Sequence, residues 1–459
     1  MLNILKICEV LKMDNKTIYA LSTVYGKSGV AVIRVSGSNA VDVFRYMTDV
    51  ETLYLKPRYA YFKDILDSKT RQILDKALIL YFKAPNSFTG EDIVEIQCHG
   101  SKAVLSSVLD SLSHIPNFRL AEPGEFSKRA FYNQKMDLTE AEGLADLIDS
   151  ETSEQQKYAL RQMQGNLKNL YEGWREELLR VYAYMEAYID FPDEDIPDSI
   201  KDSNMNAVFK LIKAIDEHLS SSKNSERLRE GFRVVVAGPA NAGKSSLLNA
   251  IVKRNAVIVS DIAGTTRDAV DVNLDIKGYP VIFTDTAGIR ETDDIIEQQG
   301  VKIALEKIED ADLVLAMFDA TVDNIDIFNN IKKESKNKLL YIANKCDNLT
   351  FEQCSEFEKQ GCLLISAKYN KGVDELVDRI GNYIGSSFTS GSNMLITRAR
   401  YREALNECLY NLRNFNFDKE IELSAEDIRL AARALGKITG RFEVDEILDK
   451  IFGSFCIGK

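Results

Sequence analysis

The sequence predicts a multidomain protein with α/β and α parts, and three observations support this fold class. Short runs of strand-forming residues alternate with helical segments over residues 17–120. Apolar residues recur at helical spacing from residue 138 to 218 and again over residues 397–452. Between these helical parts, residues 231–385 carry apolar runs that end in polar loops, as strands of an open α/β sheet do. We therefore expect an N-terminal α+β domain, a helical bundle domain, and an α/β domain inserted into that bundle.

The N-terminal domain is predicted from its mixture of elements. Residues 29–35 and 77–82 are apolar, β-branched runs that favour strands. Residues 40–47 and 101–112 have the spacing of helices. Strands and helices that alternate in this way are typical of an α+β domain.

The two helical parts are predicted to pack as one bundle. The first part has mostly 3.6-residue spacing, broken at Pro192 and Pro197, and the second part repeats that spacing. Serine-rich stretches at 219–225 and 386–392 have the composition of flexible linkers. They mark the two ends of the inserted domain.

The inserted domain begins with a phosphate-binding pattern. Residues 238–245 read Gly-Pro-Ala-Asn-Ala-Gly-Lys-Ser, follow an apolar run at 234–237 and open a helical pattern. Glycines let consecutive backbone N–H groups turn toward a polyphosphate, and the helix N-terminus adds its positive dipole end. Lys244 is expected to meet the β- and γ-phosphates, and Ser245 a magnesium ion. This segment predicts binding of a nucleoside triphosphate.

Three further loops predict that the base is guanine. Asn-Lys-Cys-Asp at residues 344–347 follows a predicted strand, and Asp347 can accept two hydrogen bonds from the N1–H and exocyclic amine of guanine. Adenine offers neither donor on that edge and would leave the carboxylate unpaired. Ser-Ala-Lys at 366–368 and Asp-Thr-Ala-Gly at 285–288 also follow predicted strands, where they would support the base and sense magnesium and the γ-phosphate.

Composition limits the other functions. A net charge of −12 over 459 residues argues against a generally basic nucleic-acid binder, so any RNA contact must use a local patch. Arg398, Arg400 and Arg402 are candidates for such a patch, although a solvated helix face is the preferred interpretation. The seven cysteines have no paired or metal-like spacing, which favours reduced thiols and a cytoplasmic location. No apolar run approaches the ~18 residues that span a bilayer, so we expect no membrane contact.

Segments outside the nucleotide motifs carry a more specific resemblance. They are Ser-Phe-Thr-Gly-Glu-Asp at 87–92, Pro-Gly-Glu-Phe-Ser-Lys-Arg-Ala-Phe at 123–131, Asp-Phe-Pro-Asp-Glu at 190–194, and the ending Phe-Cys-Ile-Gly-Lys at 455–459. Together with the nucleotide motifs, they make the chain resemble the MnmE (TrmE) family of tRNA modification GTPases from about residue 17 to the end. The domains that this resemblance implies are an N-terminal tetrahydrofolate-binding and dimerisation domain (1–135), a helical domain in two parts (136–230 and 386–459), and an inserted Ras-like P-loop GTPase domain (231–385).

The resemblance also implies an activity and partners. The family is a homodimer that hydrolyses GTP with activation by potassium. It forms a heterotetramer with the FAD-dependent flavoprotein MnmG. Together they add a carboxymethylaminomethyl or aminomethyl group to C5 of the wobble uridine of certain tRNAs, using a one-carbon unit from a tetrahydrofolate.

The folate site implied by the resemblance comprises Arg34, Glu91 and Lys135, with Lys459 of the tail. A carboxylate can accept the paired donors of a pterin edge, and basic side chains can meet the glutamate tail of a folate. The implied cofactor is 5-formyl- or methylene-tetrahydrofolate. At Arg34, Glu91 and Lys135 the other interpretation is a solvated surface charge.

The hydrolytic chemistry depends on what replaces the usual water-orienting residue. In Ras-like enzymes a glutamine follows Asp-Thr-Ala-Gly, but here that residue is Ile289, which cannot hydrogen-bond. The resemblance implies instead a potassium ion that neutralises developing charge on the phosphates. Its ligands would be Asn241, Ser260, Ile262 and Thr265, and those of magnesium would be Ser245 and Thr266. The complete set implied for GTP binding is Asn241, Ala242, Gly243, Lys244, Ser245, Ser246, Ser260, Asp261, Ile262, Ala263, Gly264, Thr265, Thr266, Asp285, Thr286, Ala287, Gly288, Asn344, Lys345, Asp347, Ser366, Ala367 and Lys368.

Two residues are candidates for catalysis. Glu297 matches the family's acidic residue that orients the attacking water through a bridging water, and its other interpretation is a helix-surface glutamate. Cys456 is either a thiol that acts on the one-carbon unit or the uridine, or a small residue that packs among apolar neighbours.

Two other functions stay open. A ribosome-assembly GTPase would act as a nucleotide-dependent switch, but such a protein normally carries an RNA-binding module after the GTPase domain. A scaffold GTPase would use nucleotide-dependent dimerisation alone and would leave the Ser-Phe-Thr-Gly-Glu-Asp segment unexplained. Detection of bound reduced folate would favour the tRNA-modifying GTPase over both of these alternatives.

Overall fold

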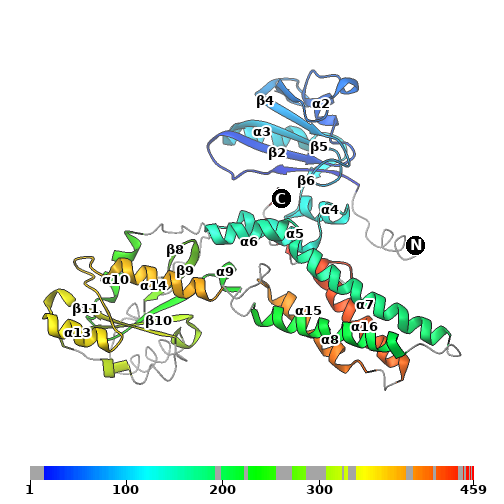
Figure 1. The fold of residues 1–459 in the computed structure, drawn as a ribbon. Coiled ribbons are helices and arrows are strands. Elements are labelled where there is room, and N and C mark those ends of the chain that lie inside the picture. The colour runs from blue at the N-terminus through cyan, green and yellow to red at the C-terminus, as the bar shows by residue number, and fades with distance from the viewer. Residues whose placement is uncertain are drawn as a thin grey trace, which may run out of the picture. The chain divides into compact units, whose positions relative to one another are not determined.

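The computed structural model describes residues 15–191, 198–221, 226–254, 271–285, 307–322, 325–328, 338–388, 396–416, 420–442, 448, 451–453, 455 and 457–458. The chain divides into two compact units. The first comprises Met1–Ala145 with Gly436–Lys459, and the second comprises Asp146–Leu435. Figure 1 labels the elements of both.

The first unit is built on one six-stranded sheet in the order β3-β4-β5-β2-β1-β6. Its strands are β1 (Thr17–Leu21), β2 (Ser28–Ser36), β3 (Ala60–Leu66), β4 (Ile73–Phe82), β5 (Ile93–Gly100) and β6 (Phe118–Leu120). All neighbours are antiparallel except β1 and β6. The helices are α2 (Asp42–Met47), α3 (Lys102–Ser113) and α4 (Glu125–Tyr132). The predicted α+β domain is therefore present.

Alternation along β2 separates a core face from a polar face. Ile33 and Val35 are buried in the cluster that also contains residues of α2 and α3. Because successive strand residues point to opposite faces, Arg34 and Ser36 lie on the other face. There a smaller apolar cluster includes Phe126 of α4. This second face holds the polar site described below.

The end of the chain belongs to the first unit. Phe452 and Phe455 pack with Leu138 and Ala141 of α5 (Leu138–Ile148). Ile457 forms a bridge with Pro123, the residue two before α4 begins. Residues more than three hundred positions apart thus share one small core.

The second unit contains long helices and a second sheet. Its helices are α6 (Ser153–Met163), α7 (Asn166–Asp190), α8 (Asp198–Ser221), α9 (Glu226–Glu230), α10 (Lys244–Val252), α13 (Phe351–Lys359), α14 (Val373–Ser386) and α15 (Ala399–Asn414). Helix α16 (Ile421–Thr439) runs from this unit into the first.

The bundle is formed from both sides of the insertion. Helix α8 packs against α7 and against α15 (Figure 1). The hydroxyl of Tyr171 on α7 lies 3.1 Å from Nε2 of His218 on α8, and the Tyr171 ring meets the ring of Tyr401 on α15. All three side chains are buried, which confirms the prediction that the two helical parts pack together.

The second sheet has the order β12-β11-β10-β7-β9-β8. Its strands are β7 (Phe232–Ala237), β8 (Asp271–Ile276), β9 (Tyr279–Asp285), β10 (Leu313–Asp319), β11 (Leu339–Asn344) and β12 (Leu363–Leu364). Only β8 is antiparallel to its neighbour. β7 and β10 are buried along nearly their whole length, as expected for strands covered on both faces. The sheet extends to both sides of β7, so the carboxyl end of β7 is a topological switch point where such folds bind ligands.

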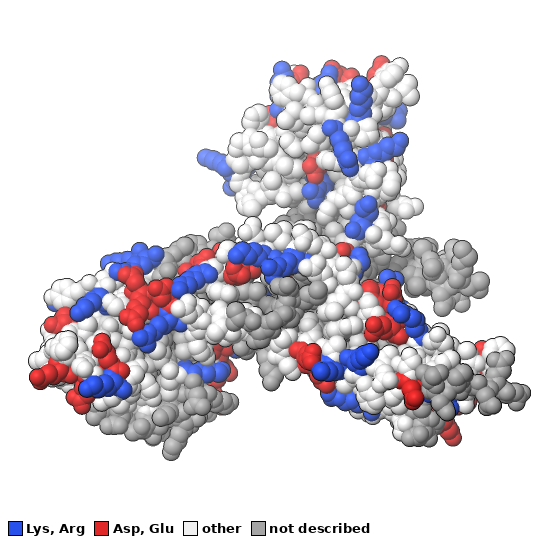
Figure 2. Space-filling model, in the orientation of Figure 1, with Lys and Arg blue, Asp and Glu red and all other residues white. Residues whose placement is uncertain are grey.

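Charge is mixed over the surface. On the face shown in Figure 2, basic and acidic side chains of the described residues are interspersed without an extended area of one sign. Among the described residues, no helix is both long and apolar enough to cross a bilayer.

Candidate functional site

The phosphate loop connects the carboxyl end of β7 to the start of α10. Gly238 has φ +154°, and a Cβ there would lie 1.9 Å from the carbonyl oxygen of Met317, so only glycine fits. Lys244, the first residue of α10, is buried, and its Nζ donates to the carbonyl oxygens of Gly238 and Pro239, both at 2.8 Å. The lysine therefore lies across the loop that is predicted to bind the phosphates.

Asn344 joins the phosphate loop to the base-binding loops. It is the last residue of β11 and is 3% exposed. Its Nδ2 donates to the carbonyl oxygen of Ala242 at 2.7 Å, and its Oδ1 accepts from the backbone N–H of Ala367 at 3.1 Å. A Cβ on Gly243 would lie 2.3 Å from the same Nδ2, which explains the glycine. One amide side chain thus brings three separate sequence motifs to one edge of the sheet.

The neighbouring base-loop residues differ in exposure. Lys345 has φ +64° and forms an ion pair with Asp319 at the end of β10. Burial raises the pKa of Asp319, but hydrogen bonds from Lys345 and Thr321 outweigh it, so the pKa lies below the ordinary value. Asp347 lies in a short 3₁₀ turn and is exposed, so its carboxylate is accessible to a ligand.

The other predicted residues of these two loops also lie nearby. Ser366 is buried, and its Oγ accepts from the backbone N–H of Tyr369 at 3.4 Å. The ammonium of Lys368 lies 4.9 Å from the centre of the Tyr369 ring. Ser245 and Ser246 are exposed in the first turn of α10. Asn241 is exposed with φ +64°, a conformation that asparagine tolerates.

Several predicted residues, or their side chains, lie outside the described part of the chain. Asp285 ends β9 opposite Val236 of β7, and nothing further is described for its side chain. The remaining predicted residues that lie outside the described residues are Ser260, Asp261, Ile262, Ala263, Gly264, Thr265, Thr266, Thr286, Ala287, Gly288, Glu297, Cys456 and Lys459.

A second polar site lies on the sheet of the first unit. Ser36 of β2 donates from Oγ to a carboxylate oxygen of Glu91 at 2.8 Å. Arg129 of α4 donates from Nη1 to both carboxylate oxygens of Glu91, at 3.2 and 3.1 Å. Thr89 accepts from the backbone N–H of Glu91 at 3.2 Å and hydrogen-bonds with Ser36 at 2.7 Å. Glu91 is therefore held by donors from a strand and a helix.

The other described residues predicted for folate lie around the same loop. The guanidinium of Arg34 forms an ion pair with Glu95 at 2.9 Å and lies 5.2 Å from the centre of the Phe88 ring. Lys135 is exposed, and its Nζ donates to the carbonyl oxygen of Pro85 at 3.0 Å. The structure thus brings Arg34, Glu91 and Lys135 around the segment 85–91.

The tail is attached close to β1. Ser22 donates from Oγ to the carbonyl oxygen of Gly458 at 3.1 Å. A Cβ on Gly458 would lie 2.2 Å from the carbonyl oxygen of Leu21, so glycine is required for this approach. Leu21 follows Ala20, the residue opposite Arg34 in the sheet.

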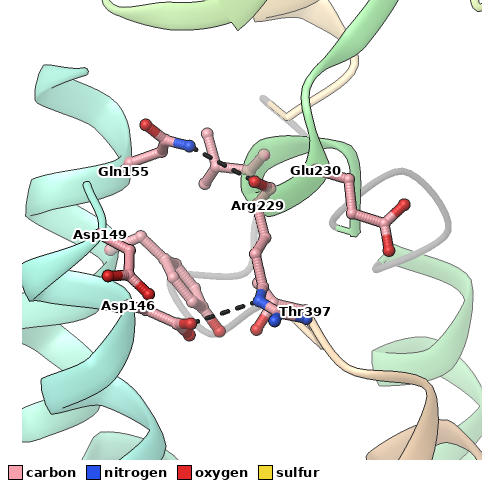
Figure 3. Close-up of a pocket in the computed structure, with 8 residues that line it drawn as sticks. Asp146, Asp149, Gln155, Arg229, Glu230 and Thr397 are labelled. Atoms are coloured by element: carbon pink, nitrogen blue, oxygen red, sulfur yellow. Dashed lines mark hydrogen bonds and ion pairs between the residues drawn. The ribbon is translucent and has the colours of Figure 1, made fainter. Parts of the chain in front are cut away.

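A cavity of about 370 Å³ lies in the second unit beside the connections to the inserted domain. Asp146 points toward Arg229 in this cavity, with 3.3 Å between Oδ1 and Nε (Figure 3). The same Oδ1 lies 2.6 Å from the guanidinium of Arg398. Arg402 forms an ion pair with Glu226 at 3.3 Å. The interpretation of Arg398 and Arg402 as a solvated helix face was wrong, because both side chains are mostly buried and join segments on either side of the inserted domain.

Comparisons with known proteins agree with this arrangement. The family model described as GTP-binding protein TrmE N-terminus matches residues 17–135, and that of the MnmE helical domain matches residues 138–456. The tRNA modification GTPase MnmE of Rickettsia bellii (strain RML369-C) is 44% identical over 453 residues, which cover 97% of this chain and 100% of that protein. The protein of the same name from Rickettsia canadensis is 45% identical over 446 residues, with the same coverage. The chain belongs to the MnmE family.

A solved structure also matches in part. Aquifex aeolicus Era is 28% identical over 40% of this chain and 67% of its own, with a TM-score of 0.28.

Two residues of this MnmE family member that form ion pairs were not predicted from the sequence: Arg129 at the polar site of the first unit and Asp146 at the cavity of the second unit. Arg129 is 2% exposed and pairs with two carboxylates, although arginine is usually a surface residue. The sequence of segment 123–131 carries the family resemblance but does not indicate that Arg129 is buried and paired. Asp146 forms ion pairs with two arginines that lie far apart in the sequence, and no local sequence pattern indicates this role.

Proposed function

We propose that this chain hydrolyses GTP and acts in tRNA modification. The observation that carries the proposal is the Asn344 side chain, which joins the phosphate loop to the Ser-Ala-Lys loop. The curated relatives, matched over their whole length, are named tRNA modification GTPases. A nucleotide bound at the carboxyl end of β7 would have its phosphates at the amides of the loop and its base at the exposed carboxylate of Asp347.

The residues present fit a magnesium-bound triphosphate. The Ser245 hydroxyl is exposed at the helix start, where a hydroxyl can ligate magnesium, and Lys244 is ready to exchange loop carbonyls for phosphate oxygens. We further propose that potassium activates hydrolysis and that Asn241 is one of its ligands. The exposed Asn241 amide oxygen suits such an ion, which would neutralise charge developing on the phosphates. Glu297 is proposed to orient the attacking water.

We propose that the first unit binds a tetrahydrofolate derivative through Arg34, Glu91 and Lys135. Support comes from the contacts that these side chains make with the loop 85–91, and from Gly458, whose carbonyl oxygen accepts from Ser22 just after β1. Lys459 would then contribute a charge and Cys456 a thiol.

The remaining proposals concern the assembly. We propose a cytoplasmic homodimer that joins an FAD-dependent MnmG-type flavoprotein in a heterotetramer and acts on the wobble uridine of tRNA. The division into a folate-binding and dimerisation domain (1–135), helical parts (136–230 and 386–459) and GTPase domain (231–385) remains a proposal as well.

The base specificity gives a direct test of the nucleotide site. Asp347→Asn removes the acceptor for the guanine amine and supplies an amide donor, which suits the C2 carbonyl of xanthine. We expect the variant to lose about a hundredfold in kcat/KM for GTP, the cost of a charge-assisted hydrogen-bond pair, and to gain activity on XTP. Glu352→Gln is the control, because it removes an exposed carboxylate from α13 and should leave the GTP/XTP preference unchanged. Unchanged GTP preference in Asp347→Asn would disprove the proposed base site.

A further inference from the structure

Arg129 is a buried cation whose hydrogen-bonding capacity is nearly filled. Its Nε and Nη2 donate to one oxygen of Glu125, at 3.3 and 3.0 Å, and Nη2 also donates to the carbonyl oxygen of Lys16 at 3.0 Å. Nη1 supplies the two hydrogen bonds to Glu91. Guanidinium has five N–H donors in a rigid plane, so these partners fix its orientation.

The two carboxylates that share Arg129 are in different situations. Glu125 is buried and also accepts two hydrogen bonds from Arg119, at 2.7 and 2.6 Å, and one from the backbone N–H of Glu122 at 2.9 Å. Burial raises the pKa of Glu125, but these donors outweigh it and lower the pKa overall. Glu125 is saturated, so its role is to hold the two arginines.

Glu91, in contrast, keeps capacity for a ligand. Its side chain is 25% exposed, and the three hydrogen bonds from Arg129 and Ser36 leave one of about four acceptor positions on the carboxylate, on Oε1. Arg129 is anchored by Glu125 and Lys16 whether or not Glu91 is engaged. The direction of the Glu91 carboxylate is therefore set before any ligand arrives, which lowers the cost of binding.

We propose that Arg129 is a positioning residue that holds the Glu91 carboxylate oriented to accept an N–H donor from a reduced pterin. This rests on the proposed folate function and adds a specificity element to it. The ligand must present an N–H donor to Oε1 of Glu91, because a carboxylate oxygen that already accepts from Arg129 can take a second donor at its other acceptor position. Arg129 itself meets Glu91 and not the ligand, so its contribution passes through Glu91.

A double-mutant cycle tests this route of action. Binding of 5-formyltetrahydrofolate to the full chain is measured by calorimetry for Arg129→Lys, Glu91→Gln and the double variant. We expect Arg129→Lys to bind at least about tenfold more weakly, because a lysine cannot reproduce the fork that meets Glu91. The double variant should bind no more weakly than Glu91→Gln alone.

Arg119→Lys is the matched control. Arg119 also pairs with buried Glu125 but has no hydrogen bond to Glu91 among those described, so a purely structural role would weaken binding in both variants. We expect affinity within about twofold of the unaltered chain. If Arg129→Lys does not fold, the cycle of Ser36→Ala with Glu91→Gln measures how much the fixed direction of the Glu91 carboxylate contributes to binding, because Ser36 is the other donor that holds it.

The possible results distinguish the positioning role of Arg129 from folate binding itself. Additive losses in the cycle, or equal losses in Arg119→Lys, overturn the positioning role while leaving folate binding intact. Wild-type affinity in Arg129→Lys does the same. No binding to the unaltered chain overturns the proposed folate function and this inference with it.

Discussion

The buried imidazole of the bundle predicts a pH-dependent stability. Burial lowers the pKa of His218 to about 4, whereas the ordinary value, expected in the unfolded chain, is about 6.5. The folded bundle therefore holds His218 neutral, and protonation favours unfolding. This stability is fully present above about pH 6.5 and is lost as the pH falls toward 4. Between pH 7 and pH 5 the loss in the free energy of unfolding should be about 2 kcal/mol.

A single tryptophan reports on this site. Trp174 is the only tryptophan of the chain, and its ring centre lies 5.6 Å from that of His218. Urea unfolding followed by Trp174 fluorescence at pH 7, 6 and 5 therefore measures the bundle itself. His218→Gln retains a polar partner for Tyr171 but has no titratable group, so it should flatten the pH dependence.

His99→Gln is the control for this experiment. It removes an exposed imidazole from the first unit, so the free energy of unfolding of the bundle should still fall by about 2 kcal/mol between pH 7 and pH 5. The reasoning is refuted if His218→Gln shows the same fall in stability between pH 7 and pH 5 as the unaltered chain.

Two further predictions concern the inserted domain. Gly278→Ala and Gly361→Ala both place an alanine at positive φ, which should lower the free energy of unfolding by about 1–2 kcal/mol in each case. The two variants differ in their contacts. The new Cβ at residue 278 would lie 2.4 Å from Oγ of Ser153, whereas the Cβ at residue 361 has no other atom within 4 Å. The backbone N–H of Glu154 donates to the Gly278 carbonyl, so we expect its hydrogen exchange to be faster in Gly278→Ala but unchanged in Gly361→Ala. Equal exchange rates at Glu154 in the two variants would contradict the contact between residues 153–154 and Gly278. GTP turnover in equal concentrations of sodium and potassium chloride should be at least about tenfold lower in sodium, and similar rates would exclude the proposed ion.

The strands and the nucleotide-binding loops could be predicted because neighbouring residues in the sequence determine them. Glycines at 238 and 243 are required by approaches of 1.9 and 2.3 Å, and the strand before the phosphate loop is marked by its apolar run. The predicted loops after β7 and β11 do lie together at one edge. Parallel strands ensure this once the α/β pattern is recognised.

Interactions between distant segments could not be predicted. Arg129 meets Glu91 across 38 positions, and Asp146 meets Arg398 across 252. An isolated arginine in a sequence carries no sign of whether it will be buried, since that depends on carboxylates brought by other elements. The same limit applies to Arg398, whose sequence context favours a solvated helix face although its side chain pairs with Asp146.

The ion pairs of Asp146 have a consequence for how this architecture can arise. Arg229 precedes β7 and Arg398 follows α14, yet both contact one oxygen of Asp146. The chain therefore departs from the bundle and returns to it at neighbouring points, so α8 and α15 can pack as though they were consecutive helices. A domain with adjacent ends can be gained, lost or exchanged without repacking its host, which is how a ready-made nucleotide hydrolase can be grafted into an unrelated helical scaffold.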